Sequence, residues 1–194
     1  MLESGVDPFE GAVEDNTRAW LERAVIGLNL CPFAKAVHAR GQIHYAVSRA
    51  RTCTTLARDL THELRTLVAL DPNVRDTTLL MAPECLAEFL EFNDFLKQAN
   101  RILAELELDG VIQIASFHPD FQFADRVANE IANYTNRAPY PTLHLLREAS
   151  VDRAVDAFPQ AESIFERNIL TMEKLGHAGW AALGLRRASP LSGP

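Results

Sequence analysis

The five residues Thr77–Met81 (TTLLM) form the middle one of three short apolar segments whose spacing decides the fold. The first of these segments spans Ile43–Val47, and the third spans Val111–Phe117. Between them lie two longer stretches in which leucine and phenylalanine recur every three or four residues, as they do on one face of a helix. The order strand, helix, strand, helix, strand is typical of parallel crossovers, so the pattern predicts an α/β fold.

The same pattern predicts one domain over residues 15–185, with a small four-stranded, mostly parallel sheet packed against several helices. A fourth apolar segment, Thr142–Leu146, supplies the last strand. No linker rich in glycine, serine or proline divides the chain. Residues 1–14 and 186–194 are expected to be flexible ends.

Cap and turn residues set the expected helix boundaries. The first helix is predicted to begin at a cap formed by Asp15 or Asn16. Pro32 interrupts it and begins a second, short helix, because proline is unfavourable inside a helix but fits the first turn. Pro83 is predicted to begin the long helix after the second strand, and Gly176 to end the last helix in a left-handed conformation.

Composition excludes several classes of protein. The chain has 194 residues, is 47% hydrophobic and carries a net charge of −7, which fits one globular domain and argues against a nucleic-acid partner. No apolar run approaches the roughly 20 residues of a membrane span, and the N-terminus lacks the apolar segment of a secretory signal. Three cysteines without CxxC spacing argue against a disulfide framework or a zinc site, so we expect a cytoplasmic protein without a membrane partner.

The long connection between the third and fourth strands carries the candidate catalytic residues. In the stretch SFHPDFQF (residues 116–123), His118 directly follows the strand and Asp120 stands two residues later. Histidine titrates near neutral pH and a carboxylate can orient it, so the pair is predicted to transfer protons. The alternative is structural, because Asp or His beside a proline often closes a turn by bonding to the backbone.

The stretch NYTNRAPYP (residues 133–141) supplies hydrogen-bond donors in the same connection. The amides of Asn133 and Asn136 and the planar guanidinium of Arg137 suit a carboxylate or phosphate, which predicts a small anionic ligand. The alternative is that these side chains bond to the backbone of their own loop.

His144 and Glu148 complete the predicted ligand site, since residues four apart share one face of a strand. With His118 and Asp120 they provide the nitrogen and oxygen donors that a metal needs. No signature spacing such as HExxH accompanies them, so no metal site is predicted, and no motif indicates a cofactor. A P-loop, a GxGxxG motif and a GxSxG motif are also absent from the sequence.

Cys31 is the third candidate catalytic residue. The short helix predicted after it would make Cys31 an N-cap, where unpaired N–H groups stabilise a thiolate and Lys35 adds a positive charge. This position suits a nucleophile, but a free cysteine among apolar residues is also commonly a small buried side chain. Cys53 and Cys85 are expected to be packing positions at helix starts.

Several stretches carry a family resemblance: WLERAVIGLNLCPFA (residues 20–34), ASFHPDFQF (residues 115–123), NYTNR to LRE (residues 133–148), ERN (residues 166–168) and LGH (residues 175–177). They closely resemble a bacterial family catalogued as domain of unknown function 1415, and the similarity extends from about Asp15 to Gly184. The resemblance implies a single-domain bacterial protein. It implies no activity and assigns no catalytic or binding residue.

Two functions follow as hypotheses. The first is an enzyme or binding protein for a small anionic molecule, in which His118 and Asp120 transfer a proton and Arg137 holds the anion. The alternative is a non-catalytic module that forms homo-oligomers or binds another protein through exposed aromatic residues. The aromatic residues of this alternative are Phe117, Phe121, Phe123, Tyr134 and Tyr140.

Overall fold

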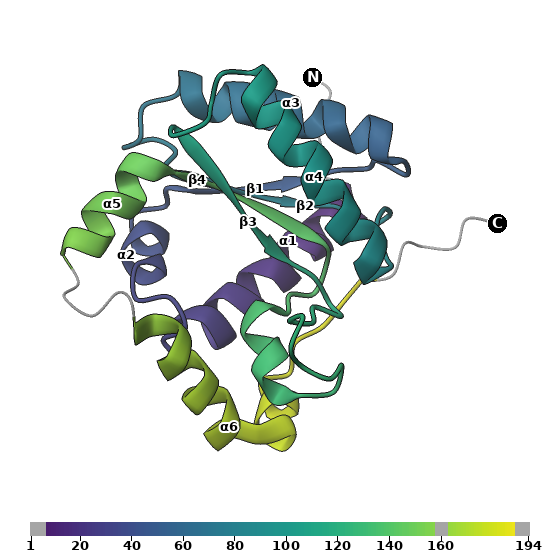
Figure 1. Ribbon diagram of the computed structural model, residues 1–194, viewed down its shortest axis with the longest axis vertical. Helices are drawn as coiled ribbons and strands as arrows, with labels where there is room; N and C mark the ends of the chain where they lie inside the picture. The colour runs from purple at the N-terminus through teal and green to yellow at the C-terminus, as the bar shows by residue number, and fades with distance from the viewer. Residues whose placement is uncertain (1–6, 158–162, 189–194) are drawn as a thin grey trace.

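A four-stranded sheet crosses the centre of the protein, with helices on both of its faces (Figure 1). The computed structural model describes residues 7–157 and 163–188. The strands follow each other across the sheet in the order β1-β2-β4-β3. Their bounds are Ile43–Val47 for β1, Thr77–Met81 for β2, Ile112–Phe117 for β3 and Thr142–Arg147 for β4.

The sheet is mixed. β1 and β2 pair in parallel, whereas β4 lies antiparallel between β2 and β3. The predicted α/β class is therefore confirmed, but the mostly parallel arrangement is wrong. Residues 118–141, which we call the connector, bring the chain back to the end of β3, where Phe117 pairs with Thr142. A strand that starts beside the end of its neighbour must run antiparallel to it.

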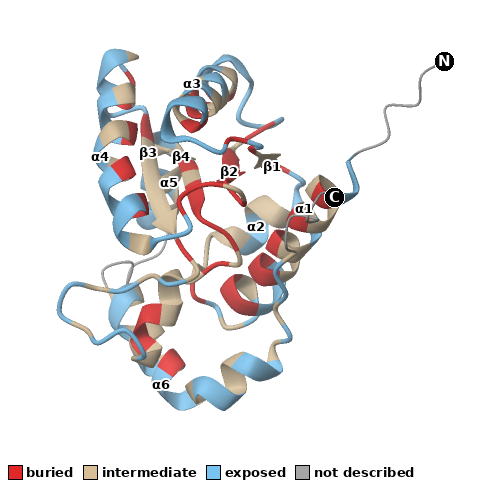
Figure 2. Ribbon diagram, turned by 90° about the vertical axis from the view of Figure 1, so that its right-hand side faces the viewer, coloured by how far each residue is buried: buried red, intermediate tan, exposed pale blue. Residues whose placement is uncertain are grey.

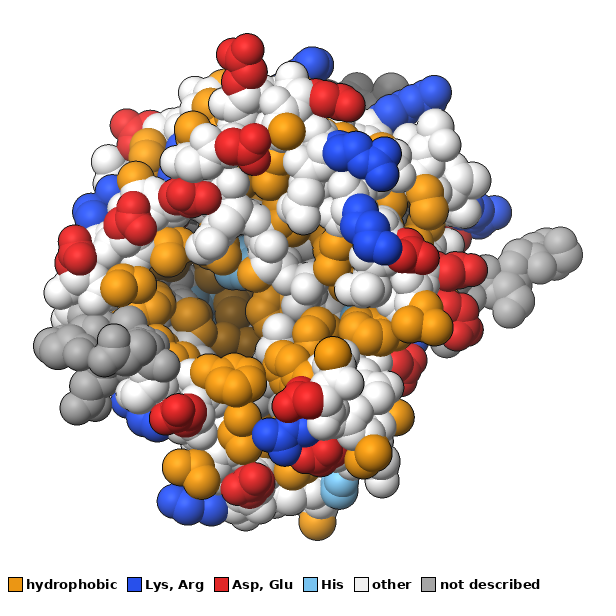
Figure 3. Space-filling view, viewed as in Figure 1, with side chains coloured by type: hydrophobic (Ala, Val, Ile, Leu, Met, Phe, Trp, Pro, Cys, Tyr) orange, Lys and Arg blue, Asp and Glu red, His pale blue; other side chains and the backbone are white. Residues whose placement is uncertain are grey.

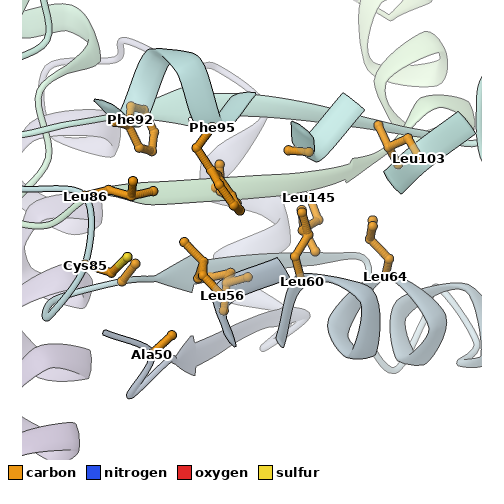
Figure 4. Close-up of a cluster of buried hydrophobic side chains, with 14 of the residues drawn as sticks. Ala50, Leu56, Leu60, Leu64, Cys85, Leu86, Phe92, Phe95, Leu103 and Leu145 are labelled. Carbon is orange, nitrogen blue, oxygen red and sulfur yellow. The ribbon is translucent and has the colours of Figure 1, made fainter. Parts of the chain in front are cut away.

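Helices α3 (Cys53–Ala69) and α4 (Phe89–Glu105) cover one face of the sheet, which we call the α3/α4 face. Thr52 caps α3, and the predicted leucine stripe of this helix is buried. Figure 4 shows these leucines packed against phenylalanines of α4 and against Leu145 of β4. α4 begins at Phe89 rather than at the predicted Pro83, because Leu86 adopts a left-handed backbone conformation with φ 58°.

Three N-terminal elements lie on the opposite face: α1 (Pro8–Trp20), the π-helical turn η1 (Leu21–Ile26) and α2 (Ala34–Ala39). α1 begins before the predicted cap, because the Asp7 side chain accepts the Phe9 N–H over 2.9 Å and proline fits the first turn. The expectation of a flexible end is therefore wrong for residues 8–14. Residues 1–6 and 189–194, which were also expected to be flexible, lie outside the described residues.

The C-terminal part contains the 3-10 helix η2 (Ile131–Asn136), α5 (Glu148–Asp156) and α6 (Ile164–Ala182). Gly176 has φ 63°, which kinks α6 at the predicted stop instead of ending it. Beyond this kink, His177 and Trp180 contact the Tyr134 ring of η2 edge to face, each at 5.3 Å. Among the described helices, none is both long enough and apolar enough to cross a membrane.

Candidate functional site

His118 lies in the core of the protein. Its imidazole is fully buried, with ring centroids 5.4 Å from Phe89 and 5.1 Å from Phe92. The Asp120 backbone N–H donates to Nδ1 over 3.0 Å, so the proton must be on Nε2, which donates to the Leu86 carbonyl over 3.0 Å. Burial lowers the pKa of His118. Both ring nitrogens are occupied by backbone, so these contacts fit the structural alternative and leave no nitrogen for the predicted proton transfer with Asp120.

The side-chain amides of Asn133 and Asn136 form hydrogen bonds with backbone groups of the connector and β3. Asn133 is buried; its Oδ1 accepts the Phe123 N–H over 3.0 Å, and its Nδ2 donates to the Val127 carbonyl over 2.8 Å. Asn136 donates from Nδ2 to the Ser116 carbonyl over 3.4 Å. These amides hold the shape of the loop, which is the alternative that the sequence left open.

Arg137 also binds backbone of the connector. Its Nε donates to the Phe121 carbonyl over 3.4 Å, and its Nη2 donates to the Ala128 carbonyl over 2.6 Å. The guanidinium lies 4.0 Å from the centre of the Tyr134 ring, in a cation–π contact. The guanidinium group that was expected to bind an anion thus donates to two backbone carbonyls of the connector.

Cys31 precedes α2 but does not cap it, because the N-cap residue is Phe33. The thiol packs against the hydrophobic cluster on the opposite face of the sheet. Burial raises the pKa of Cys31, whereas a nucleophilic cysteine needs a lowered pKa. The geometry therefore matches a half-buried packing residue.

The aromatic residues of the connector region pack against other rings and form no flat exposed patch among the described residues. Phe117 contacts Trp20 at 5.1 Å, and Phe121 contacts Phe89 at 5.2 Å. Tyr140 is fully buried, and its hydroxyl accepts the Asn16 amide over 3.0 Å. The aromatic side chains that were expected to form an interface therefore make their contacts within the molecule.

The face of the sheet opposite α3 and α4 is only partly covered. α1 and η1 pack on it over β1 and β2, where Tyr45, Leu79 and Met81 are buried. Of the side chains that strand alternation directs to this face from β3 and β4, Thr142 is buried and the others are half-buried: Gln113, Ala115, Phe117, His144 and Leu146. The cover is therefore incomplete over β3 and β4.

Figure 3 shows a deep hollow on the protein, with mainly hydrophobic side chains on its walls and histidine atoms inside it. In the same orientation, Figure 1 shows β3 and β4 above this position, α5 and α2 to its left and α6 below it. The hollow thus opens on the incompletely covered side of the sheet.

His144 is a polar side chain of this face. Its ring nitrogens have no hydrogen bond to a described residue, and neither nitrogen is sealed inside the protein. Its imidazole lies 6.2 Å from the Phe117 ring. Burial alone lowers the pKa of His144 to about 4, so the ring is neutral at pH 7. A neutral imidazole offers one hydrogen-bond donor and one acceptor.

Glu148 does not share a strand face with His144, because β4 ends at Arg147 and Glu148 is the first residue of α5. The Glu148 N–H donates to the Val111 carbonyl over 2.9 Å. Across the described ranges, no three His, Cys, Asp or Glu side chains are arranged to hold a metal ion. Glu148 therefore lies outside the strand on which it was predicted to share a face with His144.

A second depression, of about 440 Å³, lies between α3 and α4 on their outer surface. Arg58, His62 and Arg65 line it, together with Gln98 and Ile102 of α4. The three basic side chains are exposed, and none forms an ion pair with any residue that the structure describes. None of the three belongs to the site predicted from the sequence, although their spacing of three and four residues puts them on one side of a helix.

Comparison with known proteins places most of the chain in one family. No curated protein and no solved structure matches the sequence. Residues 12–182 match the family described as protein of unknown function (DUF1415). Because this match covers most of the chain, the protein belongs to the DUF1415 family, as its sequence motifs predicted.

Proposed function

We propose that this protein binds a small molecule in the hollow beside β3 and β4, with an apolar body against the walls and one polar group on His144. The imidazole of His144 carries this proposal, because it is half-buried, neutral and without a hydrogen-bond partner among the described residues. Ligand pockets are typically apolar with a few polar groups that orient the ligand, which is the composition seen here.

The low pKa of His144 defines its role as a hydrogen-bonding group. An imidazole with a pKa of about 4 is a weak base at pH 7, so it holds a ligand group more readily than it removes a proton. An anionic head group would stabilise the protonated ring and raise the pKa of His144, whereas a neutral hydroxyl or carbonyl would leave it low. The effect of a bound ligand on this pKa therefore distinguishes the two ligand classes.

Two fluorescent probes test the proposal: anilinonaphthalene sulfonate, which is anionic, and N-phenylnaphthylamine, which is uncharged. Ala115 faces the same side of the sheet as its cross-strand neighbour His144, so Ala115→Phe should fill part of the hollow. We expect the wild type to bind a probe and Ala115→Phe to bind it at least about tenfold more weakly, a loss of about 1.4 kcal/mol.

The matched control is Ala104→Phe, on the exposed surface of α4, which should bind as the wild type does. A cooperative urea transition for each variant shows that its fold is retained. If Ala115→Phe fails to fold, Gln113→Phe on the same face replaces it. Equal probe binding by the filled variant and the wild type would refute the proposal.

The depression between α3 and α4 supports a second candidate function, the binding of a small anion. In a chain with a net charge of −7, Arg58, His62 and Arg65 stand together without a carboxylate partner among the described residues. Guanidinium groups suit phosphate and carboxylate oxygens. Titration with inorganic phosphate should shift the NMR signals of residues 57–65, and Arg65→Gln should reduce the effect. Arg101→Gln, also exposed, is the control; unchanged signals would exclude this site.

A further inference from the structure

Two of the three free cysteines lie beside each other. Cys53 is exposed and begins α3, directly after the loop that follows β1. Cys85 is buried and lies in the loop that follows β2. Because β1 and β2 are adjacent and parallel, both loops leave the same edge of the sheet, and the Cys53 thiol is close enough to Cys85 to raise its pKa.

Charged side chains hold these two loops together. The Glu84 carboxylate, whose side chain is only 6% exposed, accepts Arg49 Nε over 2.8 Å and Arg51 Nη2 over 2.9 Å. Glu84 is the neighbour of Cys85, and Arg51 stands two residues before Cys53. The ion pairs therefore fix the segments that carry the two sulfur atoms.

Hydrophobic packing in the core also holds the segments of Cys53 and Cys85 next to each other. Leu56 lies one helical turn after Cys53 and belongs to the hydrophobic cluster that also contains Cys85 and Leu86. Figure 4 shows Cys85 beside Leu56 and Leu86 in this cluster. Cys53 thus lies on the same side of α3 as Leu56, which packs in the cluster with Cys85.

The start of α3 is itself well defined. Thr52 Oγ1 accepts the Thr55 N–H over 3.2 Å, and Thr55 Oγ1 accepts the Thr52 N–H over 3.3 Å, which is a reciprocal capping box. Cys53 therefore has a fixed place in the first helical turn.

We propose that Cys53 and Cys85 form a redox-active thiol pair that a hydroperoxide converts to an intramolecular disulfide. The exposed Cys53 sulfur attacks the terminal peroxide oxygen; the O–O bond breaks, the leaving alkoxide takes the Cys53 proton, and Cys53 becomes a sulfenic acid. The Cys85 sulfur then attacks Cys53, the S–O bond breaks, and hydroxide leaves as water with the Cys85 proton. Two thiols and one hydroperoxide thus give one disulfide, one alcohol and one water.

The burial of Cys85 suits the second step of this sequence. Burial raises the pKa of Cys85, and the neighbouring Cys53 adds to the effect, so this sulfur stays protonated and shielded until Cys53 has reacted. The following residue, Leu86, accepts the hydrogen bond from His118 Nε2. A bond between the sulfurs would therefore act directly on the segment that holds the connector.

The test uses the folded full-length chain and hydrogen peroxide, followed by alkylation in denaturant and intact-mass analysis. Three alkylated thiols are expected before oxidation, in line with the three free cysteines, and one afterwards. Peptide mapping should find Cys53 linked to Cys85, and dithiothreitol should restore all three thiols. In Cys85→Ala, dimedone should label Cys53, because the sulfenic acid has no resolving thiol.

Cys31→Ala is the matched control and should retain the crosslink. Three persistent thiols, a bond that involves Cys31, or a crosslink between two molecules would each overturn the proposal. If Cys85→Ala does not fold, the thiol count and the peptide map of the wild type decide the question.

Discussion

The imidazole of His118 joins three segments of the chain. Its Nε2 donates to Leu86 after β2, and its Nδ1 accepts the N–H of Asp120 at the start of the connector. The His118 backbone N–H donates to the Asn136 carbonyl near the far end of the connector, over 3.2 Å. One buried residue thus fixes both ends of a long loop against the core.

Replacement of His118 by alanine should lower the free energy of unfolding by about 3 kcal/mol, as measured by urea denaturation. The Leu86 carbonyl and the Asp120 N–H would lose their partner, and a cavity would open beside Phe92. The exposed His62→Ala is the control, with an expected change below about 0.5 kcal/mol. Equal effects of the two substitutions would contradict a structural role for His118.

His144 should make stability depend on pH. Its pKa is about 4 in the folded protein and about 6.5 in an unfolded chain, so the unfolded state binds more protons between these values. The stabilisation is complete above about pH 6.5 and is lost as the pH falls toward 4, by at most about 3 kcal/mol. Urea denaturation of the wild type and His144→Leu should show a steeper decline for the wild type. Parallel pH curves would contradict this expectation.

At the scale of elements, the sequence predicts where the strands lie in the chain better than whether they pair in parallel or antiparallel. The predicted bounds of β1 and β2 agree with the structure, and those of β3 and β4 differ by one residue. Alternation and apolar content identify a strand, but they are the same for both directions of pairing. The antiparallel place of β4 depends on how the connector folds back, which involves contacts between distant residues such as Phe117 and Thr142.

In the candidate site, the sequence likewise shows which side chains can donate hydrogen bonds but does not show which groups accept them. The sequence shows that Asn133, Asn136 and Arg137 are donors, but backbone carbonyls nearby accept their hydrogen bonds in the fold. Such bonds compete with ligand binding, and only the loop conformation decides between them. His144 was singled out from the sequence, and its place in a ligand site remains our prediction.

A buried ion pair joins α3 to the segment before β2. Arg75 is only 7% exposed; its Nη2 donates to Glu63, and its Nε donates to Thr78 Oγ1 over 3.0 Å. Glu63→Gln should lower the free energy of unfolding by about 3 kcal/mol, because it leaves a buried guanidinium without its counter-ion. Thermal or urea unfolding measures this change.

The paired substitution of Glu63→Leu with Arg75→Met is the control for this prediction. It removes both charges and should cost less than Glu63→Gln alone, since buried ion pairs often add little to stability over apolar packing. A larger loss in the double variant would show that the ion pair itself contributes most of the stability.

At the scale of the whole molecule, the two faces of the sheet are covered unequally. α3 and α4 bury continuous stripes, whereas α6 has one buried residue, Met172, and is otherwise half-buried or exposed (Figure 2). α6 packs on η2 through Tyr134 and Trp180 and lies apart from the α3/α4 cluster. The hollow lies between this outer layer and the sheet.

This arrangement predicts an uneven pattern of hydrogen exchange. Amides of α6 should exchange faster than those of α3 and β2, because fewer buried contacts oppose local opening of α6. Exchange monitored by mass spectrometry under native conditions tests the prediction. Protection of α6 equal to that of β2 would mean that both layers unfold as one unit.

The ligand site is tested most directly by NMR of the His144 ring, first as the pH is lowered and then as anilinonaphthalene sulfonate is added at pH 7. We predict a neutral ring down to a pH of about 4, and ring signals that shift as the probe saturates the wild type but not Ala115→Phe. A midpoint near 6.5, or ring signals that stay unchanged at saturating probe, would contradict the proposed site.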